Sequence, residues 1–441
     1  MEFKDYRALG DFLVQQGVRR ALFKELAEND NSKEQIYLGG SFEALNEIPF
    51  GKVRLDHTPS EPNFKAAVEL FWIDDDRNVS QAKHAQLILY PKYPEVRLSG
   101  FLRGCPSAPR SHMQPVPKSK RRGTRDGRIL VFGVTPDGRI LAYLAAPTSP
   151  VATSLRNSGH TDKREVSVFF TFPIPTVPDQ RRQILAALSD IVGAGWHNSC
   201  KLNRDGEIEP YRAPNAGGYT LEALLGVVPN GISGPDLLGW EVKAFSSDRI
   251  TLMTPEPDRG TYGTEGVLRF LQKFGHYRDP DTIYFTGVHH AGIRREDTGM
   301  MLRVDGFEYE TGKITNPRSG LVLESRTGEA AAVWSYARLL DHWGRKHNNA
   351  VYIRYTIDRQ SKEPKYRYNP TISMGTGTEF GFFLRALSEG VVVYDPAPKA
   401  TRLKNGRWKT KARNQFRIKF KDMAGLYHDF QDIRLDSVIR R

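Results

Sequence analysis

The spacing of hydrophobic residues divides the chain into segments of different periodicity. Residues 1–27 carry a helical spacing. The apolar side chains that share one face of this predicted helix are Leu9, Phe12, Leu13, Leu22, Phe23 and Leu26. From about residue 35 to 172 the pattern changes to short runs rich in β-branched and aromatic residues, separated by turns such as Pro136-Asp137-Gly138. The strands that these runs predict are Ala85–Tyr90, Glu95–Phe101, Ile129–Val134, Ile140–Ala145 and Val166–Phe172.

A proline-rich segment marks the predicted domain boundary. Pro173-Ile-Pro-Thr-Val-Pro178 holds three prolines in six residues, which favours an extended spacer. After it a helical spacing returns, and helices then alternate with strands. The residues that carry this spacing are Ile184, Leu185, Leu188, Ile191 and Val192. We therefore predict a mostly β domain over residues 1–176, a linker over 177–182 and an α/β domain over 183–441.

The overall charge is basic, because 64 lysine and arginine residues stand against 51 aspartate and glutamate residues, a net charge of +13. This excess favours a polyanionic partner, since phosphates neutralised by Lys or Arg release their counterions. A basic protein without such a partner has the same balance. The two cysteines exclude a disulfide scaffold or a four-cysteine zinc site. We expect a cytoplasmic protein without a membrane partner, since no apolar run approaches the roughly 20 residues that span a bilayer and the N-terminus lacks a signal-peptide pattern.

The most informative stretch for chemistry runs from residue 217 to 245. Trp240–Phe245 is predicted to be a strand, in which Glu241 and Lys243 share one face while the apolar residues between them face the other way. Asp236 follows Pro235 just upstream, where a turn directs its carboxylate toward the same point. Glu222 lies in a predicted short amphipathic helix before this hairpin. We expect these four polar side chains to meet.

This set of groups suits phosphodiester hydrolysis. Carboxylates such as those of Asp236 and Glu241 are the hard oxygen ligands that Mg²⁺ prefers, and Glu222 can complete the set directly or through water. The Lys243 ammonium group can orient the attacking water and offset charge on the phosphorus. An acidic-x-Lys tripeptide alone also occurs on ordinary solvated strands. His197, after Trp196, can approach a phosphate or act as a structural hydrogen-bonding group.

Residues of this region resemble the MvaI/BcnI family of restriction endonucleases, a branch of the PD-(D/E)xK nucleases related to the mismatch-repair nicking enzyme MutH. The resemblance begins at Gly195-Trp-His197 and continues through Leu221-Glu-Ala-Leu-Leu225, Pro235-Asp236 and Glu241-Val-Lys243. It extends through Ile250–Thr254 and, more weakly, to residues 415–418. It implies a mixed sheet flanked by helices. By position, Glu222, Asp236, Glu241 and Lys243 match the family's active site, which implies that all four are catalytic and that the three carboxylates bind Mg²⁺.

A basic segment near the C-terminus is the candidate DNA contact. Residues 399–421 contain ten Lys or Arg and no Asp or Glu. Arginine pairs bidentately with guanine, and asparagine or glutamine with adenine, whereas lysine suits phosphates. The predicted DNA-binding residues are Lys409, Lys411, Arg413, Asn414, Gln415 and Arg417. In the resembling family this region contacts bases, and Arg417 matches one of its arginines, but Thr410 and Ala412 replace family histidines. A solvated basic hairpin is the alternative.

The N-terminal domain resembles the B3-like effector domain of EcoRII-type enzymes in two short motifs, Phe23–Gln35 and Arg97–Pro106. The resemblance implies a B3-like pseudobarrel that binds a second copy of DNA. The DNA-binding residues it implies are Lys24, Asn29, Asn31, Lys33, Gln35, Arg97 and Arg103. A β domain that only supports the nuclease is the alternative. A B3-like barrel joined to an MvaI-like nuclease is a known arrangement.

Three functions follow in order of preference. The first is a Mg²⁺-dependent type II restriction endonuclease that cuts double-stranded DNA at a short site, with a CCNGG-type site as the family-based expectation. Such a monomer with one active site would cut the two strands in separate events. The second is a MutH-like repair endonuclease that nicks one strand, and the third is a non-catalytic DNA-binding protein. Intact Asp236, Glu241 and Lys243 argue against the third.

Overall fold

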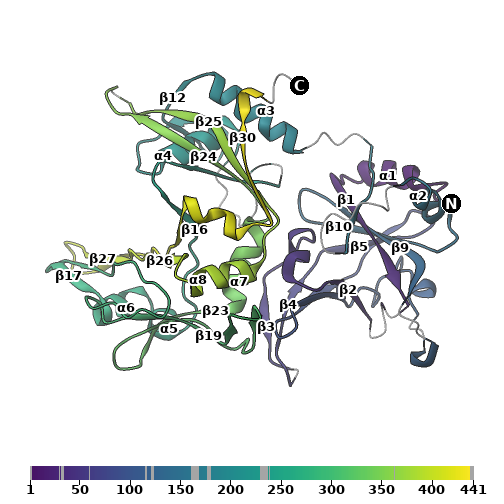
Figure 1. Cartoon of the computed structure of the whole chain (residues 1–441), viewed down its shortest axis with the longest axis horizontal. Coiled ribbons are helices and arrows are strands. Elements are labelled where there is room, and N and C mark those ends of the chain that lie inside the picture. Colours follow the sequence, from purple (N-terminus) through teal and green to yellow (C-terminus); the bar gives the residue numbers. More distant parts are fainter. Residues whose placement is uncertain are drawn as a thin grey trace. The chain divides into compact units, whose positions relative to one another are not determined.

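The computed structural model of the chain describes residues 2–28, 30, 34–58, 60–114, 117–120, 124–159, 168–175, 180–228, 237, 239–361 and 363–437. The chain divides into two compact units, Met1–Val177 and Pro178–Arg441 (Figure 1). No helix among the described residues is both long and apolar enough to cross a membrane.

The first unit is mostly β-structure. Its helices and strands are α1 (Tyr6–Gln15), β1 (Arg20–Ala27), β2 (Gln35–Gly39), β3 (Arg54–Asp56), β4 (Asn63–Ala67), β5 (Leu70–Ile73), β6 (Val79–Gln81), β7 (Gln86–Tyr90), β8 (Glu95–Ser99), β9 (Arg125–Val134), β10 (Ile140–Ala145), α2 (Pro150–Arg156) and β11 (Phe170–Thr171). One sheet has the strand order β11-β1-β9-β10-β5-β6, and another has the order β2-β8-β7-β4-β3. The strands predicted at Ala85–Tyr90, Glu95–Phe101, Ile129–Val134 and Ile140–Ala145 are confirmed as β7, β8, β9 and β10. Of the strand predicted at Val166–Phe172, residues 170–171 form β11, while residues 166 and 167 lie outside the described residues.

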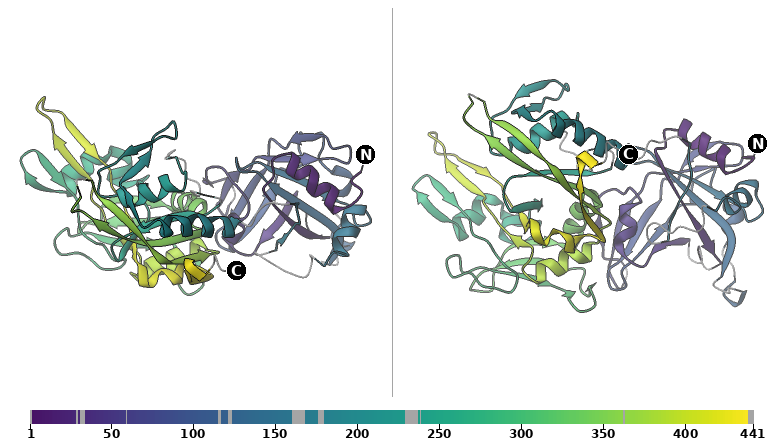
Figure 2. Two further views of the ribbon diagram at one scale, coloured as in Figure 1. Left: turned by 90° about the horizontal axis from the view of Figure 1, so that it is seen from above. Right: turned by 45° about the horizontal axis from the view of Figure 1, so that its top comes forward.

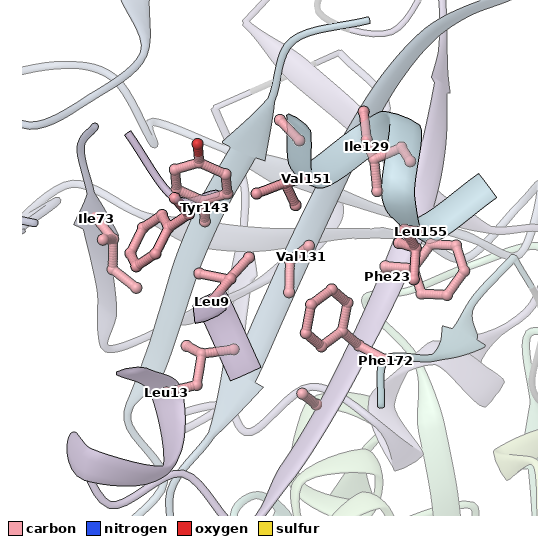
Figure 3. Packing of buried hydrophobic residues seen from close by; sticks show 14 of the residues in the cluster. Leu9, Leu13, Phe23, Ile73, Ile129, Val131, Tyr143, Val151, Leu155 and Phe172 are labelled. Carbon is pink, nitrogen blue, oxygen red and sulfur yellow. The ribbon is translucent and has the colours of Figure 1, made fainter. Parts of the chain in front are cut away.

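Helices α1 and α2 of the first unit pack on one face of its six-stranded sheet (Figure 3). Leu9 and Leu13 of α1 and Val151 of α2 are fully buried against Val131 and Tyr143 of the sheet. Local sequence explains where the helices begin. The Asp5 carboxylate accepts a hydrogen bond from the amide of Ala8 at the start of α1, and the Ser149 hydroxyl caps α2 in the same way.

The helix predicted over residues 1–27 is wrong beyond its first half. The chain leaves α1 at Gly17, whose φ of +88° lies in the left-handed region. Residues 20–27 then form β1, which is hydrogen-bonded to β9 on one side and to β11 on the other. Leu22 and Phe23 point to opposite faces and are both buried. A strand buried on both faces has a continuous apolar run, and such a run also satisfies helical spacing.

The second unit alternates helices and strands, as its sequence pattern predicts. Its helices are α3 (Gln180–Gly193), α4 (Ala216–Leu224), α5 (Gly260–Glu265), α6 (Val267–Phe274), α7 (Tyr336–Lys346) and α8 (Phe380–Ser388). Its strands are β12 (Trp196–Asn198), β13 (Cys200–Leu202), β14 (Ile208–Pro210), β15 (Glu241–Phe245), β16 (Arg249–Met253), β17 (His276–Asp279), β18 (Thr282–Tyr284), β19 (Met301–Asp305), β20 (Phe307–Glu308), β21 (Lys313–Ile314), β22 (Gly320–Glu324), β23 (Ala330–Ser335), β24 (Asn349–Asp358), β25 (Lys365–Thr376), β26 (Val393–Tyr394), β27 (Lys399–Arg402), β28 (Trp408–Lys411), β29 (Phe416–Lys419) and β30 (Asp429–Arg434).

A mixed sheet forms the centre of this unit. Its strand order is β12-β25-β24-β15, with β30 also paired to β25. Figure 2 shows this unit, coloured from teal to yellow, in two further views. β15 runs parallel to β24, whereas the other neighbours are antiparallel. Ile184 and Leu188 of α3 pack against Val351 and Ile353 of β24 in one buried cluster. This cluster covers one face of the sheet, so polar residues of the same strands are directed to the other face.

Two smaller sheets carry the basic C-terminal segment. β28 lies at the edge of the sheet β17-β18-β27-β28, and β29 is the middle strand of the sheet β16-β29-β26. β16 follows β15 after a short turn at residues 246–248. The strand that carries Glu241 and Lys243 is therefore continuous in the chain with a neighbour of β29.

Candidate active site and DNA-contacting surface

Strand β15 places Glu241 and Lys243 on the same face of the central sheet. Trp240 and Val242 pack into the core against α3 and β24, so the alternation of the strand directs Glu241 and Lys243 to the opposite face. Their side chains meet, because Lys243 Nζ donates to Glu241 Oε1 at 2.8 Å. The Glu241 residue is only 4% exposed. The predicted strand and its polar face are confirmed.

Two buried tyrosines lie beside this pair. Tyr352 of β24 is the register partner of Lys243, and its hydroxyl lies 2.7 Å from the hydroxyl of Tyr427. Burial, followed by the effect of Tyr427, raises the pKa of Tyr352 well above its ordinary value, and the charge of Glu241 adds to this. Burial likewise raises the pKa of Tyr427. Both phenols therefore stay neutral beside the carboxylate at physiological pH.

Helix α4 carries Glu222 and packs beside β15. Leu221 is fully buried in the same cluster as Val242, which fixes α4 against β15. The neighbouring Thr220 hydroxyl accepts from the Cys200 amide at 3.1 Å and so joins α4 to β13. Glu222 is half-buried, and its negative charge, after the larger effect of burial, raises the pKa of Tyr219. The helical setting predicted for Glu222 is confirmed.

Asp236 and Pro235 lie outside the described residues, so the predicted position of that carboxylate remains a prediction. His197 lies on β12, where its Nε2 is 2.7 Å from the carbonyl oxygen of Ile191. That contact joins β12 to α3. Of the two alternatives for His197, a phosphate contact or a structural hydrogen bond, the structure shows the structural hydrogen bond.

The donors in this region fit a hard divalent cation. Glu241 and Glu222 offer carboxylate oxygens, the ligand type that Mg²⁺ takes, and no thiol or imidazole is needed. Lys243 brings a positive charge to the same face, where it can bind an anionic oxygen or a water molecule. A buried carboxylate paired with an ammonium group at the surface of a sheet is an arrangement suited to activating water beside a phosphate.

The basic C-terminal segment presents its predicted residues in two different ways. Lys409 and Lys411 on β28 are exposed, as phosphate contacts must be. Arg413 is exposed and Gln415 is half-exposed. Asn414 has no exposed surface, so the prediction that it contacts a base is corrected: its amide group is bonded inside the protein.

Arg417 on β29 is held in place by two acceptors. Its Nη1 donates to Asp395 at 2.6 Å, and its Nη2 donates to the carbonyl oxygen of Arg249 at 3.2 Å. Asp395 and Thr251, which contacts Gln415, are polar residues of this surface that the sequence analysis missed. Their positions depend on pairing between distant segments, so no local pattern could have revealed them.

In the first unit the predicted DNA-binding residues also separate by exposure. Lys24 is 5% exposed and its Nζ donates to both oxygens of Asp30 at 3.0–3.1 Å, so a phosphate could bind it only by displacing that partner. We therefore assign Lys24 a structural role, which corrects its prediction as a DNA contact. Arg97 is half-buried and donates to the side chain of Gln35 at 3.2 Å. Asn29, Asn31 and Lys33 lie outside the described residues.

Arg103 lines a hollow in the surface of the first unit. The hollow has a volume of about 470 Å³ and is also lined by Lys83, His84 and Glu34. Gly100 at its edge has a φ of +68°, and a Cβ there would approach the carbonyl oxygen of His84 to 2.1 Å. This glycine is therefore required for the close approach of the two segments that form the hollow.

Comparison with known proteins identifies the second unit. The sequence model of the MvaI/BcnI restriction endonuclease family matches residues 185–427, which is more than half of the 441-residue chain. Among solved structures, the restriction endonuclease MvaI in complex with its cognate DNA substrate is 16% identical, with a TM-score of 0.45, over 58% of this chain and 99% of that chain. MvaI in the absence of DNA is 15% identical, with a TM-score of 0.34, over 59% and 100% of the two chains. No curated protein sequence matches the chain.

Proposed function

Because the chain belongs to the MvaI/BcnI restriction endonuclease family, we propose that Glu241 and Lys243 form the centre of a Mg²⁺-dependent site that hydrolyses phosphodiester bonds of double-stranded DNA at a short specific sequence. The observation that supports this most directly is the 2.8 Å contact between these two side chains on one face of β15. The protein acts in the cytoplasm as a monomer, and a CCNGG-type sequence is the expected target.

Each polar residue has a distinct role in this proposal. Asp236, Glu241 and Glu222 would hold Mg²⁺, which when bound would supply a water of lowered pKa and a counter-charge for the scissile phosphate. Lys243 orients the attacking water and offsets the negative charge that builds up on the phosphate oxygens. Tyr352 and Tyr427 are buried close enough to feel the charge of Glu241, and both remain neutral. Hydrolysis places one new oxygen on phosphorus and breaks the bond to the 3′ oxygen, which leaves a 5′ phosphate and a 3′ hydroxyl.

Digestion of a supercoiled plasmid of known sequence tests this function. With Mg²⁺ we expect open-circular DNA first and linear DNA later, because one active site cuts the two strands in separate events. Chelation of the cation should stop the reaction, and sequencing of the ends gives the target site. Open-circular DNA that never becomes linear would support the MutH-like nicking endonuclease instead. Binding without cleavage at any Mg²⁺ concentration would support a non-catalytic DNA-binding protein.

For the first unit we propose a B3-like fold that binds a second copy of DNA. Its exposed Arg103, with Lys83 and His84 around the same hollow, supports a contact with phosphates. Arg97 and Gln35, bonded to each other on adjacent strands, are candidates for contacts with base edges.

Stoichiometric titration of the full chain with a short duplex, in Ca²⁺ to prevent cleavage, tests the second DNA copy. We expect two duplexes per chain for the natural protein and one tight duplex for Arg103→Ala. Arg139→Ala is the matched control, because Arg139 is another exposed turn arginine of this unit, paired with Asp137. Saturation of the natural protein at one duplex would leave the first unit with a supporting role only.

A further inference from the structure

We propose that Arg413 contacts a guanine of the target sequence and that the buried Asn414 is the positioning residue that fixes Arg413 and Gln415 for this contact. The proposal rests on the proposed function. It names the residue that would recognise one base, Arg413, and the residue that would position it, Asn414. Residues 413–419 alternate between outward and inward side chains, with Asn414, Phe416 and Ile418 buried and their neighbours more exposed.

Asn414 is fixed by three hydrogen bonds inside the protein. Its Oδ1 accepts from the hydroxyl of Tyr394 at 2.6 Å, and its Nδ2 donates to Glu256 Oε2 and to the hydroxyl of Tyr262, both at 2.9 Å. The acceptor and both hydrogens of the side-chain amide are therefore used. Tyr262 in turn donates to Glu256. The network ties the segment to β26, to α5 and to the chain just before α5.

The backbone on either side of Asn414 is also paired. The amide of Asp395 donates to the carbonyl oxygen of Gln415 at 2.8 Å, and the amide of Ala397 donates to that of Arg413 at 2.9 Å. With the backbone and the inward side chain both fixed, the outward side chains at 413 and 415 have one direction available to them. A buried polar network whose members are all bonded specifies a single arrangement, because any other leaves a buried group without a partner.

The outward side chains form a chain of contacts of their own. Arg413 Nε donates to Gln415 Oε1 at 3.2 Å, and Gln415 Nε2 donates to Thr251 Oγ1 on β16 at 3.3 Å. In the described part of the chain no partner bonds the two terminal nitrogens of Arg413, which lie on its exposed side chain. Arg417 differs, because both of its terminal nitrogens are engaged by Asp395 and by the Arg249 carbonyl oxygen.

This geometry suits guanine. An arginine recognises guanine by donating its two terminal N–H groups to O6 and N7 in the major groove, and such a pair contributes about 5- to 150-fold of discrimination against another base. Gln415 already bonds Nε of Arg413 before DNA binds, so the arginine loses less side-chain freedom on binding. Contact with a phosphate is the alternative for an exposed arginine, and it would not depend on the base sequence.

Substitution of single guanines by 7-deazaguanine, which lacks the N7 acceptor, tests the contact. Using the target found by plasmid digestion, we would measure binding of duplexes in Ca²⁺ by the full chain. The natural protein should lose affinity at one particular guanine, by several-fold or more. Arg413→Ala should bind the unmodified target about 5- to 150-fold more weakly and should no longer respond to the modification at that guanine. Arg326→Ala, at another exposed arginine of this unit, is the matched control and should respond as the natural protein does.

The role of Asn414 is tested by base discrimination, which a loss of folding stability alone would not change. We expect Asn414→Ala to reduce discrimination at the Arg413 guanine while discrimination at the other base pairs is retained. Thr378→Val, which removes another buried hydrogen bond of this unit, should lower the melting temperature without changing that pattern. If Asn414→Ala does not fold, Gln415→Ala replaces it, because Gln415 is partly exposed. We expect Gln415→Ala to reduce discrimination at the same guanine.

Three results would overturn the proposal. In the first, Arg413→Ala keeps its response to 7-deazaguanine at every position. In the second, it weakens binding equally to target and unrelated duplexes, as a phosphate contact would. In the third, Asn414→Ala and Gln415→Ala leave discrimination at that guanine unchanged. The proposed nuclease function is tested separately, by whether the natural protein cuts the plasmid at all.

Discussion

Lys243→Ala should reduce the rate of DNA cleavage by at least about 100-fold while the affinity for the specific duplex stays nearly unchanged. In the proposed mechanism the ammonium group acts on the attacking water and on charge that develops during the reaction, and removal of one such group typically costs about 10²–10³ in kcat. In the proposed function the duplex is held by other residues, mainly the exposed lysines and arginines of the basic C-terminal segment. Single-turnover cleavage with Mg²⁺ and duplex binding with Ca²⁺ give the two quantities.

Lys201→Ala is the matched control for this substitution. Lys201 also forms a 2.8 Å contact with a glutamate, Glu209, but this pair is partly exposed on the β13–β14 hairpin. Its removal should leave cleavage close to that of the natural protein, because exposed ion pairs contribute little to stability. Undiminished cleavage by Lys243→Ala would remove Lys243 from the active site.

Glu241→Gln should abolish cleavage and also abolish the stabilisation of the protein by Mg²⁺. The substitution keeps the size of the side chain but removes the negative charge that a hard cation requires. A ligand that binds only the folded state raises its stability, so the natural protein should show a melting temperature that rises with Mg²⁺ concentration. The variant should show little or no rise, and its cleavage rate should fall by at least about 100-fold.

The same substitution at Glu209 is the control. It distinguishes the loss of a Mg²⁺ ligand from the general effect of replacing a lysine-paired glutamate by glutamine. Glu209→Gln removes a carboxylate from another lysine contact at the surface, and its melting temperature should respond to Mg²⁺ as the natural protein does. A normal Mg²⁺ response in Glu241→Gln would exclude Glu241 as a ligand, even if cleavage were lost. Thermal melts with and without DNA, recorded over a range of Mg²⁺ concentrations, give this comparison.

The face of β15 was predictable because its cause is local. A strand alternates its side chains whatever lies around it, and the apolar residues Trp240 and Val242 determine which side is buried. Glu241 and Lys243 must then lie together on the other side, as the 2.8 Å contact between them confirms. The helix around Glu222 follows from local spacing in the same way. The strands β7 and β10 were predictable for the same reason, since short runs of β-branched and aromatic residues bounded by turn signals have few alternatives.

The errors arose where long-range contacts determine the structure. Leu22, Phe23 and Leu26 satisfy the spacing of a helix, but residues 20–27 fill a gap between β9 and β11 and so become a strand. Asn414 lies between residues suited to DNA, and its chemistry alone suggested a base contact. Its burial depends on Tyr262 and Tyr394, which approach it from other segments of the chain. Neither partner could be inferred from the residues next to Asn414.

The parallel pairing of β15 with β24 has a consequence for when the enzyme becomes active. Glu241 is the register partner of Ala350, so β15, which carries the proposed catalytic pair, gains its parallel partner strand β24 only after residues 349–358 have been synthesised. β25 and β30, which complete the sheet, follow later still. Pairing of segments this far apart is among the slow events of folding. A chain that ends before residue 349 therefore lacks the partner strand of β15, and we expect such a chain to have no cleavage activity.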